Sequence, residues 1–187
     1  LLRPSVGQFS GKADNTIQDM TATHIRPCIA CDICPIHVGP DEEYRCIIKK
    51  PTDGIKLLHE SMLRPDIIVP VMYSPLDRTD LMTVYQEFME RTRYLRRGDY
   101  VFTDRLIVPL VFAELGTNEN LPIRMMTSFI RHHTVLFKPI VIWIRDGEIL
   151  NGEEIVEGLE RAIDAGNKLT GGRLGMAAGG GQSVAYK

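Results

Sequence analysis

The chain lacks the features that mark several large classes of protein. Its 22 Lys and Arg residues do not exceed its 24 Asp and Glu residues, and a formal net charge of -2 argues against a nucleic-acid-binding protein, which would carry a basic excess. The longest apolar stretches, such as 106–113 and 139–144, are far shorter than the roughly 20 residues that a transmembrane helix needs. The amino end also lacks the basic, apolar and small-residue succession of a secretory signal, so we expect a soluble, cytoplasmic protein that does not bind membranes.

Cysteine is absent outside one short segment. All four cysteines follow the pattern C-x2-C-x2-C-x11-C, formed by Cys28, Cys31, Cys34 and Cys46. A disulfide is the least favoured interpretation because cytosolic thiols stay reduced. A zinc site is an alternative, although zinc sites usually use two separated C-x2-C pairs. Three thiolates at successive spacings of three are typical of [4Fe–4S] binding, so the pattern predicts that all four cysteines ligate one such cluster.

The rest of the chain alternates between helical and extended patterns. Apolar residues recur at helical spacing in 52–63, 77–97, 121–133 and 151–169. Short apolar runs typical of buried parallel strands occupy 66–73, 105–113 and 135–144. This alternation predicts an α/β domain with a doubly wound, mostly parallel sheet.

Composition divides the chain into three regions. Residues 1–24 form an N-terminal segment, and 25–169 form the α/β domain with an inserted cysteine-rich cluster loop at 27–50. From residue 170 the chain is rich in Gly, Ala and Ser, which predicts a flexible or partner-binding tail over 170–187.

Two loops are candidates for ligand binding because sheets of this kind bind ligands outside the carboxyl ends of their strands, at the switch point. Loop 72–77 offers an aromatic ring beside hydroxyl and backbone donors, and loop 114–120 contains Gly116, which lets the chain pass close to a ligand. On composition alone, an ordinary strand-end aromatic and a solvated turn are alternative interpretations. The candidate residues are Met72, Tyr73, Ser74, Pro75, Leu76, Glu114, Gly116, Thr117, Asn118 and Asn120.

Several motifs between about Ile25 and Leu169 follow the order seen in one known family. They are Pro-Cys-Ile-Ala-Cys-Asp-Ile-Cys, Asp53 at the start of a helix, the strand Pro-Asp-Ile-Ile-Val, the helix end Glu90-Arg91-Thr92, and Phe129-Ile130-Arg131-His132-His133. The chain thereby resembles the iron–sulfur flavoproteins, which belong to the NADPH-dependent FMN reductase branch of the flavodoxin-like fold. The resemblance implies a cytoplasmic, usually oligomeric protein that holds FMN at the switch point and a [4Fe–4S] cluster nearby.

The sequence departs from the family pattern in four places. The interval between the third and fourth cysteines is longer than in the family, and the Ser-Pro-x-Tyr loop has a changed order, Met72-Tyr73-Ser74-Pro75. Only 27 residues precede Cys28, where the family has some fifty, so we expect the first strand and phosphate loop to be missing. The segment 10–16 resembles the phosphate loop in its Ser, Gly, Asn and Thr content. The Gly-rich tail has no family counterpart.

Two classes of function follow. The first is an FMN-dependent oxidoreductase or electron-transfer protein that passes electrons between FMN and a [4Fe–4S] cluster, with NAD(P)H or a redox protein as partner; it needs no general base, so no catalytic residue is assigned. The second is a non-catalytic flavodoxin-like subunit with a structural four-cysteine metal site. For both we expect a homo-oligomer or a subunit of a redox complex, because helix 77–97 carries more apolar residues than one sheet contact needs.

Overall fold

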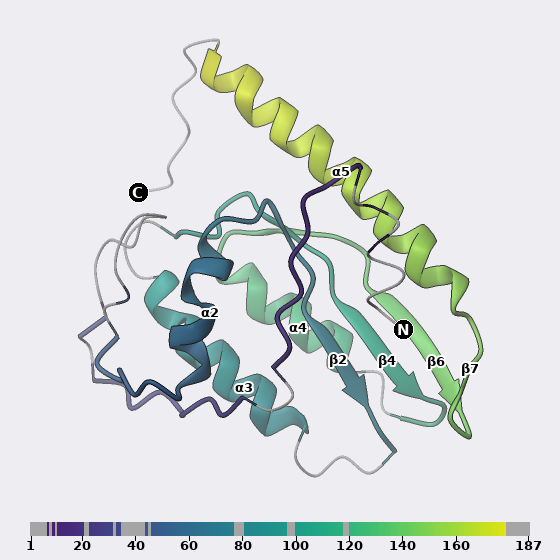
Figure 1. The fold of residues 1–187 in the computed structure, drawn as a ribbon, viewed down its shortest axis with the longest axis horizontal. Coiled ribbons are helices and arrows are strands. Elements are labelled where there is room, and N and C mark those ends of the chain that lie inside the picture. The colour runs from purple at the N-terminus through teal and green to yellow at the C-terminus, as the bar shows by residue number, and fades with distance from the viewer. Residues whose placement is uncertain are drawn as a thin grey trace.

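Three parallel strands with helices on both faces form the centre of the protein (Figure 1). The fold is that of a computed structural model, which describes residues 7, 9, 11–20, 23–31, 33–34, 44, 46–76, 81–96, 100–117 and 120–178. The predicted α/β class is confirmed. None of the helices in these ranges has the length and apolar character that crossing a membrane requires.

Each of the three predicted strands is divided in two at a proline. The pieces are β1 (Ile67–Ile68) and β2 (Val71–Ser74), β3 (Leu106–Ile107) and β4 (Leu110–Glu114), and β5 (Val135–Leu136) and β6 (Ile140–Arg145). The residues that follow Pro70, Pro109 and Pro139 pair with one another, so the three breaks form a row across the sheet. Because proline has no N–H, each one removes a donor from the ladder.

The two sets of strands remain parts of one sheet. Across the proline row, the Leu110 N–H donates to the Pro70 carbonyl at 3.0 Å and the Ile140 N–H donates to the Pro109 carbonyl at 2.8 Å. The third strand has one more residue between its two pieces than the second strand has, so it carries a bulge there. An antiparallel strand, β7 (Glu148–Ile149), closes the edge beside β6.

The strands lie in the sheet in chain order, β2-β4-β6-β7. A doubly wound sheet reverses its strand order at the switch point. The described strands contain no such reversal, so the expected switch point is not found among them. In this part of the chain β2 is an edge strand, paired with β4 alone.

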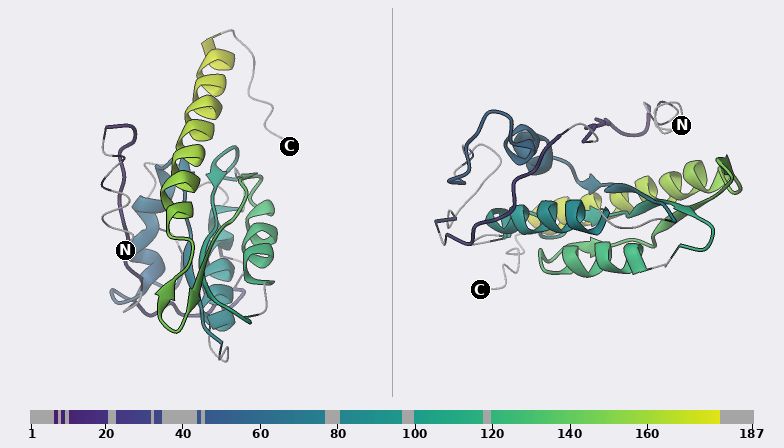
Figure 2. Two further views of the ribbon diagram at one scale, coloured as in Figure 1. Left: turned by 90° about the vertical axis from the view of Figure 1, so that its right-hand side faces the viewer. Right: turned by 90° about the horizontal axis from the view of Figure 1, so that it is seen from below.

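Helices cover the two faces of the sheet unequally. The helices are α2 (Gly54–Leu63), α3 (Leu81–Arg91), α4 (Asn120–Ile130) and α5 (Glu153–Ala178), with a 3-10 turn, η1 (Thr92–Leu95), after α3. Figure 2 shows α5 on one side of the strands and α3 and α4 on the other. The α5 side buries Leu110, Ile140, Ile142, Ile155, Leu159 and Ile163. The α3 and α4 side buries Tyr85, Val111, Ala113, Leu121 and Met125. These sets alternate along β4, as expected for a strand covered on both faces.

The predicted helix 77–97 is shorter in the structure. Among its described residues, α3 ends at Arg91 and a 3-10 turn follows. The Thr92 hydroxyl donates to the Met89 carbonyl at 2.8 Å, which offers the last turn an alternative to regular helical bonding. Tyr85 and Leu95 are 4% and 0% exposed, so these apolar side chains are used within the fold itself. The expected assembly of several chains stays a prediction.

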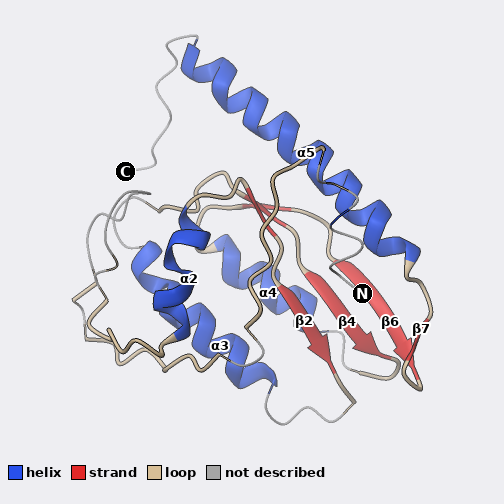
Figure 3. Ribbon diagram, viewed as in Figure 1, coloured by secondary structure: helices blue, strands red, loops and turns tan. Residues whose placement is uncertain are grey.

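The last helix is longer than predicted. The apolar periodicity predicts an end at Leu169, but α5 continues to Ala178, through Gly171 and Gly172. Figure 3 shows its second half projecting beyond the strands. The rest of the predicted tail, 179–187, lies outside the described residues.

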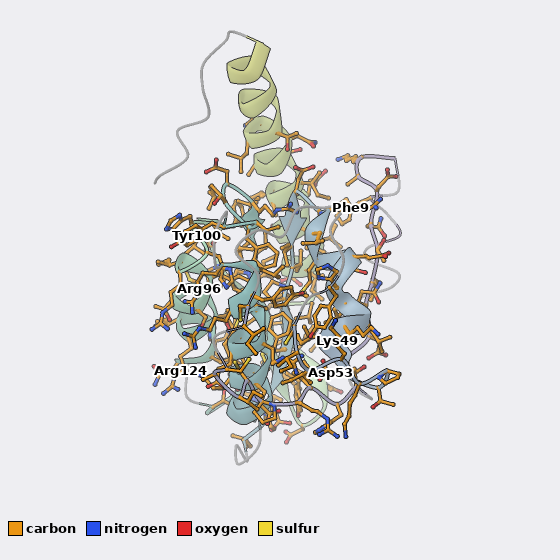
Figure 4. The ribbon with its side chains drawn as sticks, turned by 90° about the vertical axis from the view of Figure 1, so that its left-hand side faces the viewer. Phe9, Lys49, Asp53, Arg96, Tyr100 and Arg124 are labelled. Carbon is orange, nitrogen blue, oxygen red and sulfur yellow. The ribbon has the colours of Figure 1, made fainter. Side chains whose placement is uncertain are left out.

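A segment without regular secondary structure, which we call the strap (its described residues within 9–26), links α5 to α2. Phe9 is buried against α5, on the opposite side of the molecule from Tyr100 (Figure 4). Farther along the strap, Gln18 Nε2 donates to the Ser61 Oγ of α2 at 3.1 Å. At Gly54, the first residue of α2, a Cβ would lie 2.3 Å from the strap, so only glycine permits this approach. These contacts of the strap place the start of the cysteine segment near the amino end of α2.

Candidate metal and flavin site

The cysteine segment continues from the strap and carries four cysteines that form no disulfide. Cys28, Cys31, Cys34 and Cys46, all of which the structure describes, are partly buried and unbridged. Between the first two, Ala30 has a left-handed backbone with a φ of 50°, and its N–H donates to Cys28 Sγ at 3.4 Å. A backbone donor that orients a sulfur is a common feature around thiolate ligands.

The four thiols are not gathered into one site in this structure. Within the described ranges, no group of three or more His, Cys, Asp or Glu side chains is close enough to hold a metal ion. Cys34 and Cys46 pack against the same cluster of buried residues, which includes Tyr44 and Ile55. Residues 35–43 between them lie outside the described ranges. Ligation of one metal site by the four cysteines therefore stays a prediction, for which a donor set of four thiolates is chemically suited.

A buried arginine lies behind the cysteine segment. Arg91, the last residue of α3, is 2% exposed. Its guanidinium pairs with both carboxylate oxygens of Asp53, at 2.8 and 2.9 Å. It also donates to the Arg26 carbonyl at 2.7 Å and to the Tyr44 hydroxyl at 2.6 Å, and its Nη2 lies 3.9 Å from Cys46 Sγ. One guanidinium thus contacts both ends of the cysteine segment.

Asp53 has three roles at once. As expected from the sequence, it begins a helix: it is the N-cap of α2, and its Oδ1 accepts from the Ile55 N–H at 3.2 Å. Its Oδ2 also accepts from the Arg26 N–H at 3.3 Å. With the two bonds from Arg91, this 1% exposed carboxylate connects the strap, α2 and α3 (Figure 4). A buried charge needs this number of partners to offset the loss of water.

Burial and neighbouring side chains determine the protonation of Arg91 and Tyr44. Burial lowers the pKa of Arg91, but the hydrogen bonds that Arg91 donates to the Asp53 carboxylate, together with its negative charge, outweigh burial and raise it, so the guanidinium stays charged. Burial raises the pKa of Tyr44. Tyr44 therefore keeps its proton, which it donates to the Ile48 carbonyl at 3.2 Å.

Three rings lie beside the ion pair. Tyr44 meets His59 and Tyr94 edge to face, with ring centroids 5.3 Å apart in each case. His59 Nδ1 and the Tyr94 hydroxyl are 2.8 Å apart and share a hydrogen bond. Both of these side chains are buried, so the rings separate the ion pair from water on this side. The sequence analysis did not identify His59 or Tyr94, because their position in a helical pattern is the only signal that these residues carry in the sequence.

The two candidate flavin loops do come together at the carboxyl ends of β2 and β4. The Tyr73 hydroxyl donates to the Glu114 carboxylate, and the Leu76 N–H donates to the other oxygen of the same group at 3.0 Å. A Cβ placed on Gly116 would lie 3.5 Å from the Leu76 side chain. Adjacent parallel strands position these loops side by side, as expected.

The remaining candidates differ in their accessibility. Tyr73 and Leu76 are 45% and 61% exposed, whereas Ser74 and Thr117 are buried. Met72 and Pro75 are half-buried, Asn120 is the exposed first residue of α4, and Asn118 lies outside the described residues. The exposed ring of Tyr73 is the part of this edge that a planar ligand can reach.

Two backbone donors among the described residues of this edge already have acceptors. The Leu76 N–H binds Glu114, and the Thr117 N–H donates to the Glu114 carbonyl at 3.1 Å. The hydrogen bond from Tyr73 lowers the pKa of the Glu114 carboxyl, and the same bond raises the pKa of Tyr73. This edge thus carries a negative charge. A ligand that needs the Leu76 amide must displace that carboxylate.

The segment 10–16, which resembles a phosphate loop, lies elsewhere. Lys12, one of its described residues, forms an ion pair with Glu160 of α5. Figure 1 shows this part of the strap beside α5, away from the carboxyl ends of β2 and β4. The structure therefore does not bring it to the two candidate flavin loops.

The two histidines expected in a helix lie just after one. Helix α4 ends at Ile130, and His132 is 1% exposed between Phe102 and Phe129. Its Nε2 is 3.3 Å from the Thr92 hydroxyl, and its Nδ1 has no hydrogen-bond partner among the described residues. His133 has a φ of 57° and stacks on Tyr100, with centroids 4.0 Å apart. The two histidine rings therefore lie in different environments, one in the core and one at the surface.

We expect His132 to make the protein less stable in mild acid. Burial, and then the nearby Arg96, lower the pKa of His132 to about 4, below the 6.5 of the unfolded chain. The unfolded state therefore takes up a proton first, and the contribution to the free energy of unfolding, present above pH 6.5, is lost as the pH falls toward 4. The loss is about 2 kcal/mol by pH 5.

Urea unfolding at pH 7.5 and pH 5 measures this effect. His132→Gln should show a smaller difference between the two pH values than the wild type does, whereas the control His24→Gln, at an exposed histidine of the strap, should retain the full difference. An undiminished difference in His132→Gln would show that this histidine is not the titrating group.

Comparisons of the chain with protein-family models and with the sequences of curated proteins give no match, so the assignment of a function depends on the residues and contacts described above.

Proposed function

We propose that this chain is a redox protein of the iron–sulfur flavoprotein type, which passes electrons between FMN and a [4Fe–4S] cluster. The observation that carries the proposal is the set of four cysteines outside any disulfide, in the pattern C-x2-C-x2-C-x11-C. An α/β fold with a parallel sheet is compatible with the flavodoxin-like class of such proteins. Electrons would be exchanged with NAD(P)H or a redox protein.

Cys28, Cys31, Cys34 and Cys46 would hold the cluster, which supplies one-electron chemistry when bound. The protein's own part is to orient and shield these sulfurs. The Ala30 N–H holds the first thiol, and the core beside Tyr44 excludes water from the last two. Assembly of the site requires the Cys28 and Cys46 parts of the segment to close, because the described thiols are apart in this structure.

FMN, which supplies two-electron chemistry when bound, would lie against the exposed face of Tyr73. Tyr73, Leu76 and Glu114 form the nearby edge. The Glu114 carboxylate would have to turn away for the Leu76 amide to meet a polar edge of the ring. The segment 10–16 would take no part in this site, because its Lys12 pairs with Glu160 of α5.

An absorption spectrum of protein purified without oxygen, together with analysis of iron, zinc and flavin, tests the proposal. A [4Fe–4S] cluster gives a broad brown shoulder, and flavin gives bands in the blue and near-ultraviolet. We expect both, with about four iron atoms per chain. Stoichiometric zinc without iron would overturn the cluster assignment, and iron without flavin would leave only that assignment standing.

Tyr73→Ala is expected to lower the flavin content of the purified protein while its iron content stays the same. The ring offers a flat, exposed surface for stacking, and it lies at the carboxyl end of β2, on a different element from the cysteines. Phe112 on β4, paired with Tyr73 and half-buried, provides the control variant Phe112→Leu. Equal flavin content in Tyr73→Ala and the wild type would remove Tyr73 from the proposed site.

A non-catalytic subunit with a structural four-cysteine metal site is the second candidate. It is favoured by the occupied amides of Leu76 and Thr117, because neither of these two described donors is open to the polar edge of a flavin. The same spectrum separates the two candidates. Metal without flavin, before and after incubation with FMN, supports the structural subunit.

A further inference from the structure

Arg91 contacts the cysteine segment at both of its ends. Its Nη1 donates to the Arg26 carbonyl, two residues before Cys28, at 2.7 Å. Its Nη2 donates to Tyr44, two residues before Cys46, at 2.6 Å, and lies 3.9 Å from Cys46 Sγ. The chain between these points includes the first three cysteines, and the fourth follows directly. We propose that Arg91 is the positioning residue that holds the two ends of the cysteine segment beside the start of α2, from where the four thiolates can reach one metal ion.

The guanidinium is suited to this task by its shape. A planar fork with five N–H donors can bind a carboxylate with both prongs and still reach other acceptors, which a lysine ammonium cannot do. Asp53 fixes the plane of the group through two bonds. Asp53 is in turn fixed by the Ile55 amide at the start of α2. The fork therefore has one orientation, determined by residues outside the cysteine segment.

The same contact places a positive group beside one sulfur. Nη2, which donates to Asp53 and Tyr44, also lies 3.9 Å from Cys46 Sγ, and Asp53 balances most of the charge. A donor near a ligand sulfur stabilises negative charge on it and strengthens metal binding, and loss of such a contact typically costs 10–100-fold in metal affinity. For an iron–sulfur site it also favours the reduced, more negative form.

This inference deepens the proposed function, on which it rests in part, but the arms of the segment would close around any metal that takes four thiolates. The experiment therefore uses Co²⁺ alone, whose thiolate complexes absorb strongly, as the probe of the metal-free full chain. Removing Arg91 alone would leave Asp53 as an unpaired buried charge. The test variant is the double substitution Asp53→Asn with Arg91→Gln, in which an Asn remains as N-cap of α2.

Arg105→Gln is the matched control. Arg105 is also a partly buried arginine that donates to backbone carbonyls, but its acceptors are those of Leu63, Pro65 and Val101, which lie outside the cysteine segment. We expect the double variant to bind Co²⁺ about 10–100-fold more weakly than the wild type does, and Arg105→Gln to bind it with wild-type affinity. Circular dichroism checks that both variants are folded.

A second measurement separates positioning from simple loss of structure. In protein loaded with iron, the midpoint potential of the double variant should fall by about 59 mV, because the donor to Cys46 is gone. This shift corresponds to a tenfold change in the one-electron equilibrium constant. Equal Co²⁺ affinity in the double variant and the wild type would overturn the inference, as would absence of Co²⁺ binding by the wild type. The proposed function would be overturned, and the role of Arg91 would stand, if the wild type binds Co²⁺ tightly but the protein purified without oxygen contains neither iron nor flavin.

Discussion

Replacing Cys34 by Ser is expected to abolish the binding of iron by protein purified without oxygen. A hydroxyl is a much harder and less acidic ligand than a thiol, and the pattern C-x2-C-x2-C-x11-C contains no spare cysteine to take its place. Cys34 also packs against the buried cluster that includes Tyr44, so its sulfur belongs to the inner side of the segment. The same loss is expected for Ser at Cys28, Cys31 or Cys46.

Ile33→Ser is the matched control for that loss. Ile33 is 59% exposed and directly precedes Cys34, so the control places the same new side chain in the same loop without removing a thiol. Iron content per chain and the brown absorption are the measurements. If Cys34→Ser retained iron at the level of Ile33→Ser, four-cysteine ligation would be wrong.

Asp53→Ala is expected to be the most destabilising single change in the described part of the chain. It leaves Arg91 buried without its counter-charge, which costs about 3–5 kcal/mol. It also removes the N-cap of α2, which costs about 1 kcal/mol. Domains are stable by about 5–15 kcal/mol in total, so the variant should unfold at far lower urea concentrations than the wild type.

Two comparisons identify the cause. Asp53→Asn keeps an N-cap and should recover the capping contribution, but it still leaves Arg91 without a negative partner. Asp164→Ala removes an exposed aspartate of α5 and should change the free energy of unfolding little. A cost below about 1 kcal/mol for Asp53→Ala would mean that Arg91 and Asp53 do not form the buried pair.

The order of helices and strands could be predicted from the sequence, but their interruptions could not. Apolar runs located all three parallel strands, because a strand covered on both faces must be apolar throughout. Pro70, Pro109 and Pro139 were visible in those runs. Their effect depends on register, since a missing N–H opens the ladder only where a neighbouring carbonyl needs it, and register is not a local property.

The sequence predicted the candidate metal ligands but not the buried ion pair that lies behind them. Four cysteines at short spacing are recognisable in any chain, but burial of Arg91 is not, because arginines are almost always exposed unless paired. The partner Asp53 is 38 residues away along the chain, so only the packing of α3 beside α2 brings the two together. Asp53 itself was recognised as a helix start, since capping is a local interaction.

The second half of α5 differs from the first in what sustains it. Up to Leu169 the helix packs on the sheet, whereas Gly171 and Gly172 are exposed, and a Cβ added to either would meet no other described atom within 4 Å. Each glycine disfavours the helical state by about 1 kcal/mol relative to alanine. A short helical end with this composition is marginal in water by itself. A neighbouring molecule that binds the helical form would therefore shift the helix–coil equilibrium of this end. The shift would have little effect on the stability of the folded sheet.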